Sequence, residues 1–227
     1  KKKALQKNKN EIIKKNMFVD FFSYFFLFLW MDLFVTNYVT NMGVYFLMHF
    51  FHNCLVSYYT LANVYHVFSS CHGNDMLSNQ VVPLIYAFHV YHIFRYLEYF
   101  RPDDWYHHIF SMAIAVPLTF AYFDQEDLLG MCFFFTTGFP GGVNYLLLFL
   151  SKNNCGVSKR TQQQCNTLIQ SWIRCPGIVM NSGFVAKHVC ERSTNLIDQL
   201  SGCIIFLILF WNGIYFQNIV LENYYAA

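Results

Sequence analysis

Charged residues are scarce in this chain. Only 12% of its 227 residues are Asp, Glu, Lys or Arg, whereas 56% are hydrophobic and 20% are aromatic. Soluble domains carry about 25% charged residues, so the deficit argues against a water-soluble domain. The formal net charge of +2 indicates little about partners, and we expect no nucleic acid among them.

Other familiar patterns are also missing. The eight cysteines form no Cys-x-x-Cys motif, and most lie inside apolar runs, where a cysteine is usually a small hydrophobic residue. The last apolar run, residues 197–221, has no lysine, which excludes a retinal Schiff base. The N-terminus resembles neither a signal peptide nor a transit peptide. Because the chain starts at Lys1 without Met, we expect a processed or partial sequence.

Several apolar runs approach the roughly 20 residues that a helix needs to cross a bilayer. They predict an all-α polytopic membrane protein with about seven transmembrane helices. A Lys- and Asn-rich basic segment, residues 1–16, precedes a single transmembrane domain, residues 17–227. Glycines and a proline within 138–142 predict a packing kink in the fifth span. The expected spans are 17–35, 43–68, 81–100, 104–123, 128–150, 163–185 and 197–221.

Polar residues recur at helical spacing in three of these spans, and each set follows one helix face. Such stripes either make hydrogen bonds between helices or line a polar cavity. Three stripes together favour six helices around a polar-lined cavity. The stripes are His52, Tyr59, Asn63 and His66; His89, His92, Tyr96 and Tyr99; and Gln163, Thr167, Gln170, Arg174, Gly177 and Asn181.

The strongest candidate site is the segment 101–108, Arg-Pro-Asp-Asp-Trp-Tyr-His-His. On a helix, Asp104 lies three and four residues before His107 and His108, within reach of both imidazoles. A carboxylate that hydrogen-bonds an imidazole prepares it as a general base or nucleophile. The short connection before it predicts a helical hairpin, which brings the His89 and His92 face near the His pair.

The pattern Asp104-x-x-His107-His108 at the start of a span resembles the TRAM–LAG–CLN8 (TLC) domain family, the fold of the ceramide synthases. The resemblance covers about residues 45–221 and includes an arginine in a late span, Arg174. It implies a barrel of six helices around a lipid-sized cavity, with one helix outside. It also implies acyl transfer from acyl-CoA to a long-chain amine by the His pair.

One motif of that family is absent. Ceramide synthases carry further acidic residues one span after the His pair, where this chain has Phe-Thr-Thr-Gly-Phe-Pro at 135–140. The resemblance therefore supports a fold better than a reaction.

We expect an integral membrane protein that binds a long-chain lipid in a central cavity. The most specific function that we expect is acyl transfer. His107 or His108 would act as base or acyl acceptor, and Asp104 would orient it. The lipid is an expected partner, no cofactor is firmly implied, and acyl-CoA is the expected co-substrate. Substrate contacts are expected from His89, His92, Tyr96, Asn144 and Arg174, with Arg174 binding a carboxylate or phosphate.

Two alternatives stay open. The first is a non-enzymatic accessory subunit or lipid-binding scaffold that contacts other membrane subunits. The second is a metal site formed by the histidines at 89, 92, 107 and 108, because imidazole is a good ligand for iron or zinc. It is less favoured because the histidines at 49, 52 and 66 lack the regular spacing of the His boxes found in membrane di-iron enzymes. No metal ligand is assigned. We expect the endoplasmic reticulum membrane, with the mitochondrial inner membrane as the alternative.

Overall fold

The computed structural model describes residues 2–40, 42–69, 80–100, 102, 105, 108–115, 117, 126–192 and 196–226. Within these ranges the chain is helical, with no strand, which confirms the all-α class. The elements are α1 (Lys2–Tyr38), α2 (Val44–Ser69), α3 (Val81–Tyr96), the 3-10 turn η2 (Leu97–Tyr99), the π-helix η3 (Ile109–Ala115), α6 (Glu126–Thr136), α7 (Phe139–Lys152), α8 (Lys159–Ile169), the π-helix η4 (Gln170–Arg174), α9 (Cys175–Arg192) and α10 (Leu196–Tyr225).

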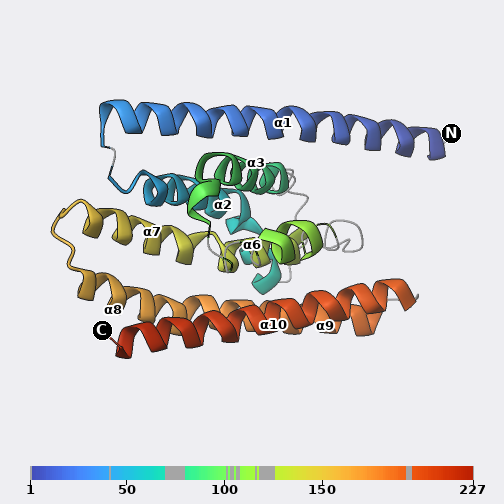
Figure 1. Cartoon of the computed structure of the whole chain (residues 1–227). Coiled ribbons are helices and arrows are strands. Elements are labelled where there is room, and N and C mark those ends of the chain that lie inside the picture. Colours follow the sequence, from blue (N-terminus) through green and yellow to red (C-terminus); the bar gives the residue numbers. More distant parts are fainter. Residues whose placement is uncertain are drawn as a thin grey trace.

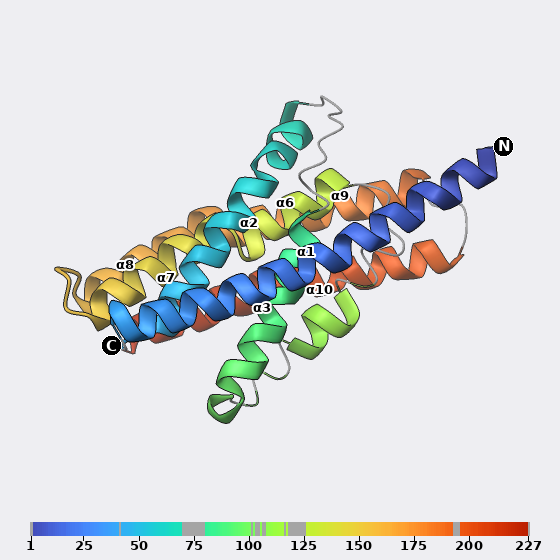
Figure 2. The same ribbon diagram turned by 90° about the horizontal axis from the view of Figure 1, so that it is seen from above.

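The helices stack in layers (Figure 1). Helix α1 forms one outer side and packs on α3, and α2 packs on α6 and α7. Helices α8, α9 and α10 cover the other outer side, where α10 packs along α9. Seen from above, α2 and α3 cross the stack obliquely, whereas α1, α9 and α10 run roughly along one direction (Figure 2).

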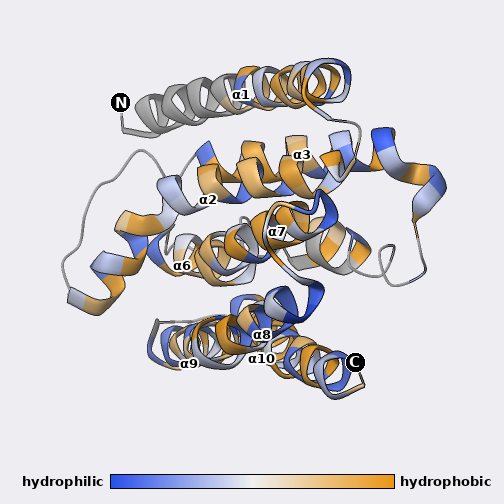
Figure 3. Ribbon diagram, turned by 90° about the vertical axis from the view of Figure 1, so that its left-hand side faces the viewer, coloured by the Kyte–Doolittle hydropathy of each residue, from blue (hydrophilic) through white to orange (hydrophobic). Residues whose placement is uncertain are grey.

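Three described helices are long and apolar enough to cross a membrane, namely the stretches Met17–Tyr38, Asp127–Lys152 and Leu196–Tyr225. The outermost two, in α1 and α10, bury only 17% of their most apolar window, and Figure 3 shows how hydrophobic residues spread over them. Exposed apolar surface of this kind suits contact with lipid. The chain therefore has the character of a membrane protein.

The prediction of seven spans is not confirmed. Helix α3 has 16 residues and is about 24 Å long at 1.5 Å per residue, less than the roughly 30 Å hydrocarbon core. The combined helix α8–η4–α9 is long enough but carries the polar stripe of the sixth predicted span. Helix α1 runs without a break from Lys2 to Tyr38, so no break in the helix sets the predicted basic segment apart from the first span. A barrel of six helices stays a prediction.

The kink predicted in the fifth span is a true break between α6 and α7. Gly138 caps α7 from outside the helical region, at φ −54° and ψ −114°. The glycines after it let α2 approach closely: a Cβ at Gly141 would lie 2.6 Å from Asn53 Nδ2, and one at Gly142 would contact Asn53 Cβ at 3.5 Å. The break therefore serves packing, as the sequence predicts.

The sixth predicted span is one turn longer at its start than expected. Helix α8 begins after Ser158, whose Oγ accepts a hydrogen bond from the Thr161 backbone N–H at 3.0 Å. The helix then widens into the π-helix η4. π segments often mark functional sites, and a second one, η3, directly follows His108.

An ion pair between an exposed arginine and a buried carboxylate joins α1 to α3. Asp32 is 2% exposed on α1, and Arg95 Nε on α3 donates to its Oδ2 at 2.7 Å. Thr36 Oγ1 donates to the other carboxylate oxygen at 3.4 Å. A carboxylate inside an apolar helix needs such partners. This pair explains how α1 tolerates an acidic residue in its apolar half.

We expect Arg95→Gln to destabilise the protein by roughly 1–3 kcal/mol, because it leaves the buried Asp32 carboxylate without its charged partner. Thermal unfolding in detergent measures the loss. The double variant Asp32→Asn/Arg95→Gln should recover part of it, since neither charge then remains. Lys187→Gln is the control, because the Lys187–Glu191 pair is exposed on both sides and should contribute little. Equal losses for Arg95→Gln and Lys187→Gln would contradict the assigned role of the pair.

Candidate functional site

His108 lies against the two histidines of α3. Its side chain is 5% exposed, and its ring centroid lies 5.1 Å from that of His89 and 5.3 Å from that of His92. The Phe100 ring stacks on His108 at 4.9 Å, with the two rings 4° from parallel. The predicted approach of the His pair to the α3 face is thus confirmed for His108. Asp104 and His107 lie outside the described residues.

Helix α2 adds two further histidines. His49 is 8% exposed, with its ring 4.9 Å from that of His92. His52, one turn later, is 1% exposed and stacks on Phe88 of α3 at 4.1 Å. The buried imidazoles of α2, α3 and the segment before η3 therefore form one histidine cluster, made of His49, His52, His89, His92 and His108.

Backbone carbonyls orient two rings of the cluster. Nδ1 of His49 lies 2.8 Å from the Tyr45 carbonyl oxygen, and Nδ1 of His89 lies 2.8 Å from the Ile85 carbonyl oxygen. A carbonyl can only accept a hydrogen bond, so Nδ1 is the donor in both rings. In a neutral ring the lone pair is then on Nε2, which is the nitrogen that can accept a proton.

The remaining predicted substrate residue of α3 also joins the cluster. The Tyr96 ring lies 5.6 Å from His92 and 5.2 Å from Tyr45 of α2. Asn144 is placed differently: its Oδ1 accepts a hydrogen bond from Gln162 Nε2 at 2.8 Å, which joins α7 to α8.

Tyr145 extends the histidine cluster onto α7. Its ring lies 4.4 Å from that of His49. A continuous row of rings thus leads from His108 through His92 and His49 to Tyr145. Arg174, the last residue of η4, donates from Nη2 to the Thr136 carbonyl oxygen at 2.7 Å.

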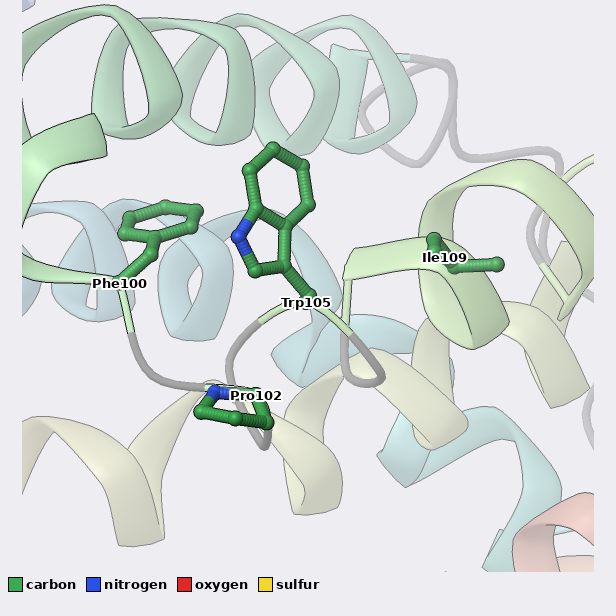
Figure 4. A pocket seen from close by; sticks show the side chains of 4 residues that line it. All are labelled: Phe100, Pro102, Trp105 and Ile109. Atoms are coloured by element: carbon green, nitrogen blue, oxygen red, sulfur yellow. The ribbon is translucent and has the colours of Figure 1, made fainter.

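An open, apolar pocket of about 380 Å³ lies beside His108 (Figure 4). Phe100, Pro102, Trp105 and Ile109 line it. Phe100 is therefore a wall shared by the pocket and the cluster, since its ring also stacks on His108. Trp105 packs edge-on against Phe100 with ring centroids 5.4 Å apart. Trp105 and Ile109 are themselves exposed, so this is an open hollow rather than an enclosed cavity.

Several of these residues were not among those predicted from the sequence. His49 precedes His52 by three residues, a helical spacing that could have identified it. Phe100 and Trp105 flank or lie inside the 101–108 segment, so the segment itself was the signal. Nothing in the sequence indicates Tyr145, because its contact with His49 depends on how α2 crosses α7.

The second half of the α2 stripe serves packing. Asn63 Nδ2 donates to Asp127 Oδ1 at 3.0 Å, and His66 Nδ1 lies 3.4 Å from the same oxygen. These contacts bind α2 to α6. The predicted stripe therefore divides, with His52 in the histidine cluster and the later residues in helix–helix contacts.

The described part of the chain contains no group of three or more His, Cys, Asp or Glu side chains arranged to hold a metal ion. Imidazoles beside an apolar pocket suit proton transfer. An oriented imidazole can take a proton from an attacking amine or hydroxyl, which is the general-base step of acyl transfer.

No protein-family model matches the chain, and neither a curated protein nor a solved structure shows significant similarity to it.

Proposed function

We propose that this membrane protein binds a long acyl chain in the pocket beside His108 and transfers its acyl group with His108 as the base. The observation that supports this most is the shared Phe100 wall, which is both a lining residue of the pocket and a stacking partner of His108. A chain bound along that wall would bring its carbonyl carbon to the histidine cluster. The resemblance to ceramide synthases at 104–108 supports the same reaction.

The proposed step balances without a cofactor. His108 accepts the proton of a long-chain amine as its nitrogen attacks the acyl-CoA thioester carbonyl. The amide C–N bond forms, the C–S bond breaks, and the leaving CoA thiolate takes that proton from the His108 imidazolium, which restores the base. The proposal places this reaction in an intracellular membrane, with the endoplasmic reticulum as the first choice.

The second candidate is a lipid-binding subunit without chemistry. The apolar outer faces of α1 and α10 favour it, because they suit partner helices as well as lipid. Both candidates need the pocket to hold a lipid chain, but only the first needs His108 for turnover.

We expect Trp105→Ala to weaken binding of tritiated palmitoyl-CoA to the purified full chain in dodecyl maltoside by about tenfold or more, because the pocket loses its largest apolar wall. Trp172→Ala is the matched control, since Trp172 is 77% exposed and does not line the pocket. Equal affinity in both variants and in the wild type would rule out the pocket as the lipid site. Binding without any transfer would favour the accessory subunit.

A further inference from the structure

A row of polar side chains follows η4 into α9. Gln170 and Asn181 are each 1% exposed, and Arg174 lies between them. Residues four and seven positions apart share one side of a helix, so the three side chains follow one line. Buried polar groups in proteins normally have hydrogen-bond partners, and this row should therefore have them too.

Most polar atoms of the row have no partner within the described residues. This is true of Gln170 Nε2, Arg174 Nε and both polar atoms of Asn181. On the neighbouring helix α10 it is also true of Asn212 Oδ1 and Gln217 Oε1. A single such atom needs no special explanation, but several on adjoining turns are costly to leave unpaired. Their grouping indicates a polar ligand.

The charge of Arg174 indicates which kind of ligand fits. Its Nη2 bonds the Thr136 carbonyl oxygen, and its guanidinium carbon lies 5.5 Å from the centre of the Phe216 ring. Neither neighbour carries a negative charge, and no ion pair within the described residues includes Arg174. A cation inside a membrane protein is costly without an opposite charge. The missing partner is therefore an anion.

We propose that Arg174, with Gln170 and Asn181, binds the anionic end group of a ligand, a carboxylate or a phosphate. The planar guanidinium donates to both groups with matching geometry, and Gln170 Nε2 supplies a further donor. The idea that the anion is the end group of a lipid rests on the proposed function. The anion site itself is tested separately.

The test compares four probes bound to the full chain in dodecyl maltoside, an uncharged detergent, by native mass spectrometry and thermal stabilisation. Palmitate carries a carboxylate, lysophosphatidate carries a lipid phosphate, hexadecanol has the chain without charge, and inorganic phosphate has the charge without a chain. The variants are Arg174→Gln, Arg174→Lys and Gln170→Leu. Arg160→Gln is the control, because Arg160 is exposed at the start of α8.

We expect an anionic probe to bind at least about tenfold better than hexadecanol, the effect of hydrogen bonds to a charged group. Arg174→Gln should abolish this preference, Gln170→Leu should weaken it, and Arg174→Lys should retain part of it. Arg160→Gln should leave it unchanged. The preferred probe then identifies the source as a fatty carboxylate, a lipid phosphate or a free anion.

The inference is wrong if no anion binds better than hexadecanol, or if the preference survives in both Arg174→Gln and Gln170→Leu. Gln170→Leu keeps the test decisive even if Arg174→Gln fails to fold, since it replaces an unpaired buried amide with an apolar side chain of similar size. Failure of hexadecanol to bind, with phosphate still bound through Arg174, would instead contradict the proposed lipid pocket and leave the anion site standing.

Discussion

His108→Ala is expected to lower acyl transfer by about 10²–10⁴-fold, the usual contribution of a general base. The imidazole of His108 lies beside the pocket, because Phe100 stacks on it and lines the pocket. Truncation removes the proton acceptor but leaves the pocket walls in place. The rate should therefore fall while the KM for acyl-CoA changes little. The measurement is amide formation from palmitoyl-CoA and a long-chain amine by the purified chain.

His66→Ala is the matched control for this experiment. His66 lies on α2, like His49 and His52, but it pairs with Asp127 of α6 at 3.4 Å. It should keep most of the transfer rate even if stability falls. A His108→Ala protein that turns over at the wild-type rate would show that the cluster is structural, and the accessory-subunit proposal would then be the better one.

Gly177→Ala is expected to destabilise the protein by roughly 1–3 kcal/mol, the range for overpacking a core. A Cβ at Gly177 would overlap the ring of Phe135 on α6. Phe135 is itself buried with Met131 and Ile178, so the ring has little room to move. The overlap forces α9 away from α6 and also shifts η4, which carries Arg174. Thermal unfolding in detergent should show a lower Tm.

Gly183→Ala provides the opposite result on the same helix. Gly183 is exposed in α9, and a Cβ there would meet no atom within 4 Å. Alanine also has a higher helix propensity than glycine, so this variant should be neutral or stabilised by up to about 1 kcal/mol. If the two variants shift the Tm equally, the close packing of α6 against α9 is incorrect.

Helix boundaries were the part of the fold most accessible from the sequence. The apolar run 43–68 predicts α2 to within one residue of Val44–Ser69. Gly43 adopts a positive φ of 71° directly before it, a conformation that glycine tolerates best. The last predicted span, 197–221, begins one residue after the start of α10 but ends four residues before its end at Tyr225. Apolar periodicity and a glycine at the boundary are local signals, and they were sufficient for α2.

The arrangement of the helices was less accessible. Spacing within α3 correctly puts His89, His92 and Tyr96 on one face, and the short hairpin connection correctly brings His108 to that face. The partners from α2 and α7 depend on crossing angles that side-chain packing decides, so the contacts that His49 and Tyr145 make with the cluster could not be predicted in advance. The π-helical turn at η4 also has no simple sequence signal.

Hydropathy alone does not establish the number of spans, for a related reason. Polar residues that pack helices together lower the mean hydropathy of a helix just as cavity-lining residues do. In α2 both uses occur, since His52 belongs to the histidine cluster and Asn63 bonds Asp127 of α6. Only the contacts in the folded chain show which polar residues pack helices together and which line a site.

The most direct test of the account is photocrosslinking from inside the pocket. Benzoylphenylalanine in place of Trp105, irradiated in native membranes, should capture a lipid with a long acyl chain that mass spectrometry identifies on residues 100–109. The same amino acid in place of the exposed Trp172 should capture only lipids in their bulk membrane proportions. Capture of one enriched acyl lipid at position 105 is the predicted result. Bulk proportions at both positions would contradict the claim that this pocket holds the substrate beside His108.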